Sequence, residues 1–330
     1  MRAAFFVEAG RLEVREVDPQ PLGAGEARLR VLACGICGSD VSMFKTGMMA
    51  GPQRVLGHEI AAVVEEDPTG ATRPGDRVTW WPARGCGECV WCEEGFPRYC
   101  LHPPDWQGGF AEEMVVRADT LIGVPEGVDD RAASLAEPLG IGIRAVDEAG
   151  VAEGDLAFVS GLGSIGVLVV AALRERGARV IGADIREDRR ELGMRYGCEM
   201  AFDPVAEDPW WKTLAVDLHG PGFAFECSGA ASAVQMAFNV CGHRGTVVLL
   251  GIPFEPVFFI PAVMSVKEQR AVSMSGPTPA TMRSALDLLA RRPEIADVVT
   301  GAVPLDGAEG AMQDLADGRG GVKILVEPGS

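Results

Sequence analysis

Short apolar runs alternate with longer stretches of helical periodicity through the second half of the chain. The apolar runs predict strands at 155–160, 179–184, 222–229 and 246–253. The segments between them repeat apolar positions at helical spacing, as over 209–219 and 231–242. Strands that alternate with helices form parallel sheets, because each crossover helix packs back onto the sheet. The pattern therefore predicts an α/β fold with a doubly wound parallel sheet.

The most apolar stretch of the chain, 156–173, carries no charged residue over 18 positions. At that length a membrane span has to be considered. Three glycines and two serines interrupt the stretch, however, and it coincides with the first predicted strand and the helix after it. We interpret it as a buried strand followed by a buried helix, and we expect no membrane contact.

Three glycines follow the first strand in the spacing G-x-G-x-x-G. Strand, glycine turn and helix in this order are typical of a dinucleotide site, because the helix N-terminus attracts a pyrophosphate. Asp184 ends the next strand about 20 residues later, the interval expected for an acid that binds the ribose hydroxyls. The residues assigned to cofactor binding are Gly161, Gly163, Ser164, Ile165, Gly166, Asp184, Arg189 and Gly251.

The choice between the two nicotinamide cofactors depends on charge near Asp184. A carboxylate at this position repels the additional 2′-phosphate of NADP, so it favours NAD. Arg186 and Arg189 follow closely in the sequence and are capable of reversing that preference. We therefore expect NAD, with NADP as the alternative.

Length and charge restrict the classes of partner. A chain of 330 residues suggests two domains. Its net charge of −17 argues against nucleic acid or an anionic membrane as partner, since both favour a basic surface. The first 15 residues carry only a short apolar run, which is too short for a secretory signal. We expect a cytoplasmic protein.

Four of the nine cysteines fall within the segment GCGECVWCEEGFPRYC, at Cys86, Cys89, Cys92 and Cys100. A reducing cytoplasm disfavours disulfides between them. The last spacing is too long for a ferredoxin-type cluster, and no proline follows it. Closely spaced thiolates on glycine-containing turns suit tetrahedral zinc. Because four thiolates leave no open coordination position, such a zinc ion is structural.

A second set of possible metal ligands is scattered through the chain. "CGICGSD" at 34–40, "LGHE" at 56–59 and "AEPLG" at 136–140 supply one thiolate, one imidazole and two carboxylates. Catalytic zinc sites usually draw three ligands from distant elements and leave a fourth position open. Each residue also has a plain structural interpretation as a buried cysteine, a core histidine or a loop acid. The candidate ligands are Cys37, His58, Glu59 and Glu137.

Together with "GDRV" at 75–78 and "GGFAE" at 108–112, these motifs resemble the zinc-containing medium-chain dehydrogenase/reductase family. The polyol branch, such as sorbitol dehydrogenase, and threonine dehydrogenase are most similar. The resemblance covers essentially the whole chain. It implies a GroES-like partial β-barrel over 1–138 and 277–330, and a Rossmann domain over 139–276, with the active site in the cleft.

The resemblance also implies roles for single residues. Cys37 and His58 correspond to zinc ligands, and Glu137 stands at the position of the third ligand, with Glu59 as its rival. Asp40 corresponds to the carboxylate that orients the histidine. Ser39 corresponds to the hydroxyl that passes on the substrate proton. Relatives often carry a histidine where this chain has Ser42, so the relay beyond Ser39 has to differ.

The implied activity is zinc-assisted hydride transfer between NAD and a secondary alcohol such as a polyol, sugar, cyclitol or amino alcohol. The alternatives are an NADP-dependent aldehyde or ketone reductase and a non-catalytic dinucleotide-binding redox sensor. We expect two zinc ions per subunit, one catalytic and one structural. In the family that the chain resembles, the edge corresponding to the apolar segment 256–276 pairs sheets across a dimer, so the resemblance implies a homodimer or homotetramer. Trp80 and Trp81 are expected either to line the substrate pocket or to pack in the core and against the cysteine lobe.

Overall fold

A computed structural model describes the chain except for residues 49–52, 84, 104–107 and 254–255. The described chain forms two compact units. The first comprises Met1–Glu137 and Met282–Ser330, and the second comprises Pro138–Thr281. The chain therefore leaves the first unit after residue 137 and returns to it at residue 282. The helices α4 (Ala136–Ala149) and α10 (Pro279–Arg291) contain the two crossing points.

The first unit is built mainly on antiparallel strands. Its strands are β1 (Arg2–Glu8), β2 (Arg11–Glu16), β3 (Glu26–Gly35), β4 (Arg54–Val55), β5 (Glu59–Glu66), β6 (Arg77–Trp80), β7 (Glu113–Arg117), β8 (Leu121–Gly123), β15 (Val299–Pro304) and β16 (Lys323–Glu327). Of these, β15 and β16 form a parallel pair. Among the described residues, one sheet has the order β2-β1-β4, and a larger one has the order β15-β16-β3-β5-β6-β8 with β7 beside β3. Strands from both ends of the chain thus share the larger sheet.

Short helices complete this unit. They are α1 (Gly38–Thr46), α2 (Val90–Glu93), α3 (Asp130–Ala133), α11 (Ala308–Ala316) and the 3₁₀ turns Pro97–Tyr99, Ala118–Thr120, Pro293–Val298 and Leu305–Gly307. Helix α1 ends at Gly47, whose φ of 71° lies in the left-handed region that favours glycine. Phe44 of α1 is buried in the apolar core of the unit. That contact fixes the helix that begins after its N-cap residue Cys37 and carries Asp40 in its first turn.

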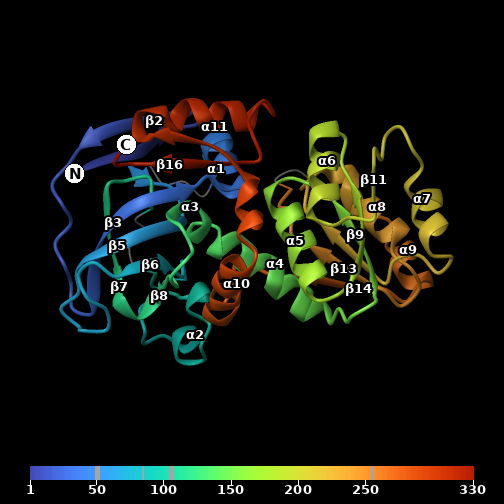
Figure 1. Cartoon of the computed structure of the whole chain (residues 1–330), viewed down its shortest axis with the longest axis horizontal. Helices are drawn as coiled ribbons and strands as arrows, with labels where there is room; N and C mark the ends of the chain where they lie inside the picture. The colour runs from blue at the N-terminus through green and yellow to red at the C-terminus, as the bar shows by residue number, and fades with distance from the viewer. Residues whose placement is uncertain (49–52, 84, 104–107, 254–255) are drawn as a thin grey trace. The chain divides into compact units, whose positions relative to one another are not determined.

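The second unit contains a parallel sheet. Its elements are β9 (Leu156–Ser160), α5 (Ser164–Glu175), β10 (Arg179–Ala183), α6 (Glu187–Tyr196), β11 (Met200–Phe202), α7 (Pro209–Val216), β12 (Phe223–Glu226), α8 (Ala231–Val240), β13 (Thr246–Leu249), α9 (Pro261–Val266) and β14 (Arg270–Ser273). The strand order β11-β10-β9-β12-β13-β14 is parallel at every described pair. Helices α5 and α6 lie on one side of the sheet, and α8 and α9 lie on the other (Figure 1). This confirms the predicted doubly wound fold.

The apolar stretch 156–173 forms β9 and most of α5, as the sequence analysis predicted. Every residue of β9 is buried, because a central parallel strand is covered on both faces. Helix α5 buries most of its length against β9 and β10. None of the helices in the described ranges is long and apolar enough to cross a membrane.

Candidate functional site

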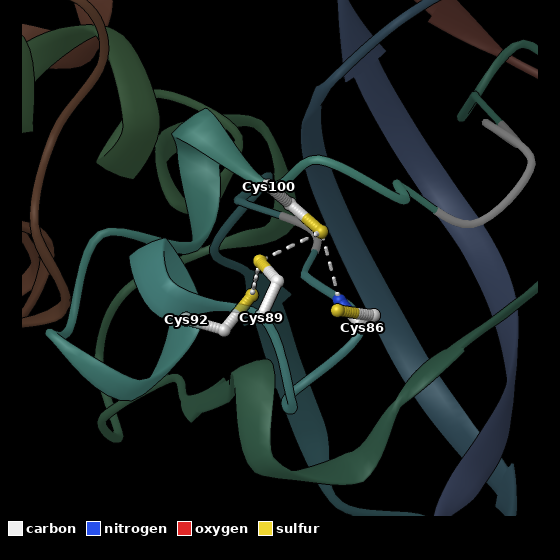
Figure 2. Close-up of side chains that lie close together, drawn as sticks. All are labelled: Cys86, Cys89, Cys92 and Cys100. Atoms are coloured by element: carbon white, nitrogen blue, oxygen red, sulfur yellow. Dashed lines mark hydrogen bonds between the residues drawn. The ribbon is translucent and has the colours of Figure 1, made fainter.

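The four cysteines of segment 86–100 bring their sulfur atoms together on a small lobe (Figure 2). Sγ of Cys89 lies 3.5 Å from Sγ of Cys92 and 3.8 Å from Sγ of Cys100. The backbone N–H groups of Cys86 and His102 donate to Sγ of Cys100, at 3.1 and 3.3 Å. We call this group the cysteine lobe.

The sulfur separations in the cysteine lobe fit tetrahedral zinc better than a disulfide. A disulfide joins two sulfurs at about 2.05 Å. Zinc–sulfur bonds of about 2.3 Å set the corners of a tetrahedron about 3.8 Å apart. Hydrogen bonds, first from the backbone of Leu101, lower the pKa of the Cys89 thiol to about 6, whereas burial raises that of Cys92 to about 11. The donor set therefore suits a zinc ion that stabilises thiolates.

A second group, the mixed-donor cluster, consists of Cys37, His58 and Glu59. One ligand atom from each lies within 4.8 Å of the others. Gly35, near the end of β3, pairs with Glu59 at the start of β5, which brings Cys37 and His58 together just beyond the paired ends. A Cβ on Gly35 would lie 2.0 Å from Oε2 of Glu59. Glycine at 35 therefore leaves the space that the glutamate side chain fills.

Asp40 connects the parts of this cluster. Its Oδ2 accepts the backbone N–H of Cys37 at 3.0 Å, and its Oδ1 accepts that of Gly57 at 3.3 Å. The same Oδ1 lies 3.6 Å from Nδ1 of His58. Burial acts to lower the pKa of His58, but the charges of Asp40 and Cys37 and the hydrogen bonds to them raise it well above its usual value. Asp40 thus fixes the start of α1 and faces the imidazole.

The carboxylate of Glu59 is held by a lysine that the sequence analysis missed. Nζ of Lys323 donates to both carboxylate oxygens, at 2.8 and 2.7 Å, and to the carbonyl of Ile36 at 3.0 Å. The two side chains are 0% and 1% exposed. Burial opposes the lysine's charge, but Glu59 and then Cys37 outweigh it, so the pKa of Lys323 is raised. The sequence feature that could have indicated this buried lysine is its position at the start of the apolar strand KILVE.

Glu137 lies in the first turn of α4 and is buried. Its Oε2 has no hydrogen-bond partner among the described residues. Burial is the main cause that raises the pKa of this carboxyl to about 7, and the charge of Glu59 adds to the shift while those of His58 and Lys323 oppose it. A buried carboxylate oxygen without a donor is costly unless a cation completes it. Glu137 therefore fits a metal ion, as do the thiol, imidazole and carboxyl of the mixed-donor cluster.

The serines and tryptophans that the sequence analysis considered for this site differ in burial. Ser39 and Ser42 lie on α1 and are half-buried. Trp80 is fully buried in the core of the first unit, while Trp81 is half-buried. The structure thus supports the core interpretation for Trp80.

The glycine turn of the second unit has the geometry that a phosphate needs. Gly161 has a φ of 85°, and a Cβ there would lie 2.7 Å from Cβ of Ser228. A Cβ on Gly166 would lie 1.8 Å from the carbonyl oxygen of Gly161. A Cβ on Gly163, in contrast, would meet nothing within 4 Å. Gly163 precedes Ser164 and Ile165 at the N-terminus of α5, so an anion can approach the helix end there.

Asp184 braces this turn and borders a hollow. Its Oδ2 accepts the backbone N–H of Leu162 at 2.8 Å, and its Oδ1 accepts that of Arg186 at 2.9 Å. The hollow has a volume of about 440 Å³ and is lined by Gly161, Asp184 and Ser228, among others. A carboxylate oxygen has two lone pairs, so Asp184 can still accept ribose hydroxyls.

Of the eight predicted cofactor residues, Gly161 and Asp184 line that hollow, and the other six lie outside its lining: Gly163, Ser164, Ile165, Gly166, Arg189 and Gly251. Arg189 is buried on α6, beside Asp188. Gly251 packs closely against the loop after β12, where a Cβ would lie 2.2 Å from the backbone nitrogen of Gly229. Glu226, which the sequence analysis did not single out, organises this loop by accepting the backbone N–H groups of Ser228 and Gly229 at 2.7 and 3.1 Å. The sequence feature that could have indicated this role is the position of the glutamate at the end of the apolar strand FAFE.

Comparison with known proteins identifies the family. Residues 23–126 match the alcohol dehydrogenase GroES-like domain, and residues 164–291 match the zinc-binding dehydrogenase model. A sorbitol dehydrogenase of Halalkalibacterium halodurans is 28% identical, over 97% of this chain and 96% of the relative. The 2-dehydro-3-deoxy-L-galactonate 5-dehydrogenase of Pseudoalteromonas atlantica is 34% identical, over 73% of this chain and 72% of the relative.

A solved structure supports the same assignment. A putative zinc-binding dehydrogenase from Sinorhizobium meliloti, bound to NADP, superposes with a TM-score of 0.87 at 30% identity, over 99% of both chains. The GroES-like fold predicted for the first unit is thereby confirmed. The chain belongs to the zinc-containing medium-chain dehydrogenase/reductase family, in its polyol and threonine dehydrogenase-like branch, and it is an oxidoreductase.

Proposed function

We propose that the protein oxidises a secondary alcohol group of a polyol, sugar, cyclitol or amino alcohol with NAD, and reduces the corresponding ketone in the reverse direction. The observation that carries this proposal is the mixed-donor cluster together with the buried Oε2 of Glu137, which has no hydrogen-bond partner among the described residues and whose carboxyl responds to the charges of His58 and Glu59. Relatives that act on sorbitol and on a sugar acid support the substrate class. The enzyme would carry two zinc ions per chain, one of them in the cysteine lobe.

Cys37 and His58 would hold the catalytic zinc, which when bound supplies a Lewis acid that polarises the substrate oxygen. Two carboxylates compete for the third position. Glu59 lies closer to the other donors, but both of its oxygens already accept from Lys323. Breaking that buried pair would leave an ammonium group uncompensated. We therefore assign the third position to Glu137 and give Glu59 a charge-balancing role.

The other side chains have positioning and proton-transfer roles. Asp40 accepts from the backbone of Cys37 and faces Nδ1 of His58, so it would fix the imidazole that carries the opposite nitrogen to the metal. Ser39, two residues after Cys37, would receive the substrate proton. Since Ser42 replaces the histidine that often ends the relay in relatives, we expect water to carry the proton onward.

Asp184 supports NAD as the preferred cofactor. Its carboxylate, which borders the hollow beside the glycine turn, would accept the ribose hydroxyls and repel a 2′-phosphate. NADP remains the alternative cofactor, because a solved relative is bound to NADP. Measuring kcat/KM with both cofactors for the wild type and for Asp184→Gly tests this assignment, and equal use of both by the wild type would contradict it.

The function is tested with a panel of secondary alcohols and NAD, together with metal analysis. We expect NADH formation, two zinc ions per chain in the wild type and one in Cys37→Ser, with turnover lost in the variant. A single zinc in the wild type and no turnover would favour a dinucleotide-binding sensor. Cytoplasmic location and assembly as a homodimer or homotetramer stay predictions, and the mass in solution tests the assembly.

A further inference from the structure

Part of the hollow beside Asp184 is lined by residues that do not belong to the glycine motif. Beyond Gly161 and Asp184, apolar groups of Ile185, Val205 and Trp210 line it. Trp210 lies in the first turn of α7, far in sequence from the glycine turn. An aromatic side chain, 36% exposed, thus borders the same hollow as the carboxylate assigned to the ribose.

Two independent contacts fix this tryptophan. Asp208 caps α7, and its Oδ1 accepts the backbone N–H of Trp210 at 2.9 Å. Nζ of Lys267 lies 4.6 Å from the centroid of the indole ring. That ammonium group also donates to the carbonyl oxygens of Asn239 and, at 2.8 Å, Cys241 near the end of α8. The ring is therefore held by the cap of its own helix and by a cation anchored on a neighbouring helix.

We propose that Trp210 is the base-recognition residue of the dinucleotide site and stacks on the adenine ring. This inference rests on the proposed function, because it requires that the hollow bind a nicotinamide dinucleotide. With the pyrophosphate at Gly163 and the ribose at Asp184, the base projects along the wall that contains Ile185 and Trp210. Every base has a π-face, and stacking on an aromatic side chain is sequence-tolerant but strong. Fixing the ring in advance lowers the ordering cost of binding.

The neighbouring residue supplies a matched control. Trp211 follows Trp210 on the same helix, but it is 68% exposed and does not line the hollow. Substitutions at the two positions remove the same side chain from the same helix turn. A purely structural role for a tryptophan on α7 would therefore be revealed by both variants, whereas base stacking requires Trp210 alone.

The test measures binding of ADP-ribose, which contains adenine but no nicotinamide, to the full-length zinc-loaded protein. Alanine substitution of a base-stacking aromatic weakens binding about 5- to 150-fold. We expect this loss in Trp210→Ala and an unchanged Kd in Trp211→Ala, by titration calorimetry. Intrinsic fluorescence gives a second readout: ADP-ribose should quench the wild type and Trp211→Phe but lose most of its effect in Trp210→Phe.

The outcomes separate this inference from the proposed function. Unchanged ADP-ribose affinity in Trp210→Ala, with binding by the wild type intact, overturns the stacking role and leaves the dehydrogenase assignment in place. Failure of the wild type to bind ADP-ribose or any nicotinamide dinucleotide overturns both. If Trp210→Ala does not fold, Phe and Leu variants decide: stacking requires that Phe bind more tightly than Leu, and equal affinities contradict it.

Discussion

The cysteine lobe and the mixed-donor cluster both gather side chains that could hold a metal ion, but they do so in opposite ways. The lobe takes four identical donors from sixteen consecutive residues and holds them with short turns. The mixed-donor cluster takes a thiol from the N-cap of α1, and an imidazole and a carboxyl from the start of β5, while Glu137 of α4 is a separate candidate ligand. It also buries an ion pair, Glu59 with Lys323, at its edge.

This difference matters for chemistry. Four thiolates saturate a tetrahedral ion, so the lobe can only stabilise local structure. A cluster of three donors leaves a coordination position open, but its buried carboxylates need compensation from cations or hydrogen bonds. Lys323 supplies that compensation for Glu59, whereas Oε2 of Glu137 has no hydrogen-bond partner among the described residues and would be compensated by the proposed metal ion.

The largest effect is expected from removing the imidazole. His58→Ala should lower kcat/KM for secondary alcohols by at least about 10³-fold, because metal polarisation contributes several kcal/mol to catalysis. Zinc content should fall from two to one per chain, while the thermal midpoint changes little. His102→Ala, which alters an exposed histidine beside the cysteine lobe, is the matched control. An active His58→Ala protein would remove the functional difference between the two clusters.

The next largest effect concerns the buried ion pair. Lys323→Met leaves the carboxylate of Glu59 buried without its partner, so we expect a loss of about 3–5 kcal/mol in the free energy of unfolding of the zinc-free protein. Denaturant titration measures this loss. The double variant Glu59→Gln/Lys323→Met should recover part of it, since no charge is then left buried. If the double variant were as unstable as the single one, packing rather than charge would explain the loss.

Breaking the cysteine lobe should affect stability more than chemistry. Cys89→Ser is expected to lose one zinc ion per chain and to open segment 86–100 to proteolysis, because the short turns have little core of their own. Turnover should fall less than about tenfold, far less than in His58→Ala. Limited proteolysis and zinc analysis check this expectation, and a full loss of turnover with an intact second zinc site would contradict it.

The smallest effect is a pH dependence in the zinc-free protein. The pKa of Glu137 is raised from 4.5 to about 7 by burial, so the folded state binds this proton more tightly than the unfolded state. Its contribution to stability is therefore fully present below pH 4.5 and is lost as the pH rises toward 7, by about 1–3 kcal/mol. Thermal midpoints between pH 5 and 8 should show this slope in the wild type. Glu137→Gln stays neutral and should flatten it.

The second unit shows how far local patterns reach. Apolar runs and glycine spacing predicted β9, β10, β12 and β13, helices between strands and the turn at Gly161, because burial on both faces and positive φ leave direct marks in the sequence. The short strands β11 and β14 were not among the predicted ranges. The roles of Trp210 and Glu226 left no such marks. The indole ring of Trp210 depends on Lys267, which is distant in the chain. Glu226 acts locally on Ser228 and Gly229, but its burial is not apparent from its position at the end of an apolar strand.

The sequence by itself determined the types of donor in both clusters and, through tight spacing, the whole of the cysteine lobe. Only the tertiary structure decided how the mixed-donor cluster is balanced. The register of β3 with β5 brings Cys37 to His58, and the pairing of β16 with β3 brings Lys323 to Glu59 from the other end of the chain. Coulomb energies depend on the distance between charges and on their burial. For residues far apart in the sequence, only the folded structure sets both quantities.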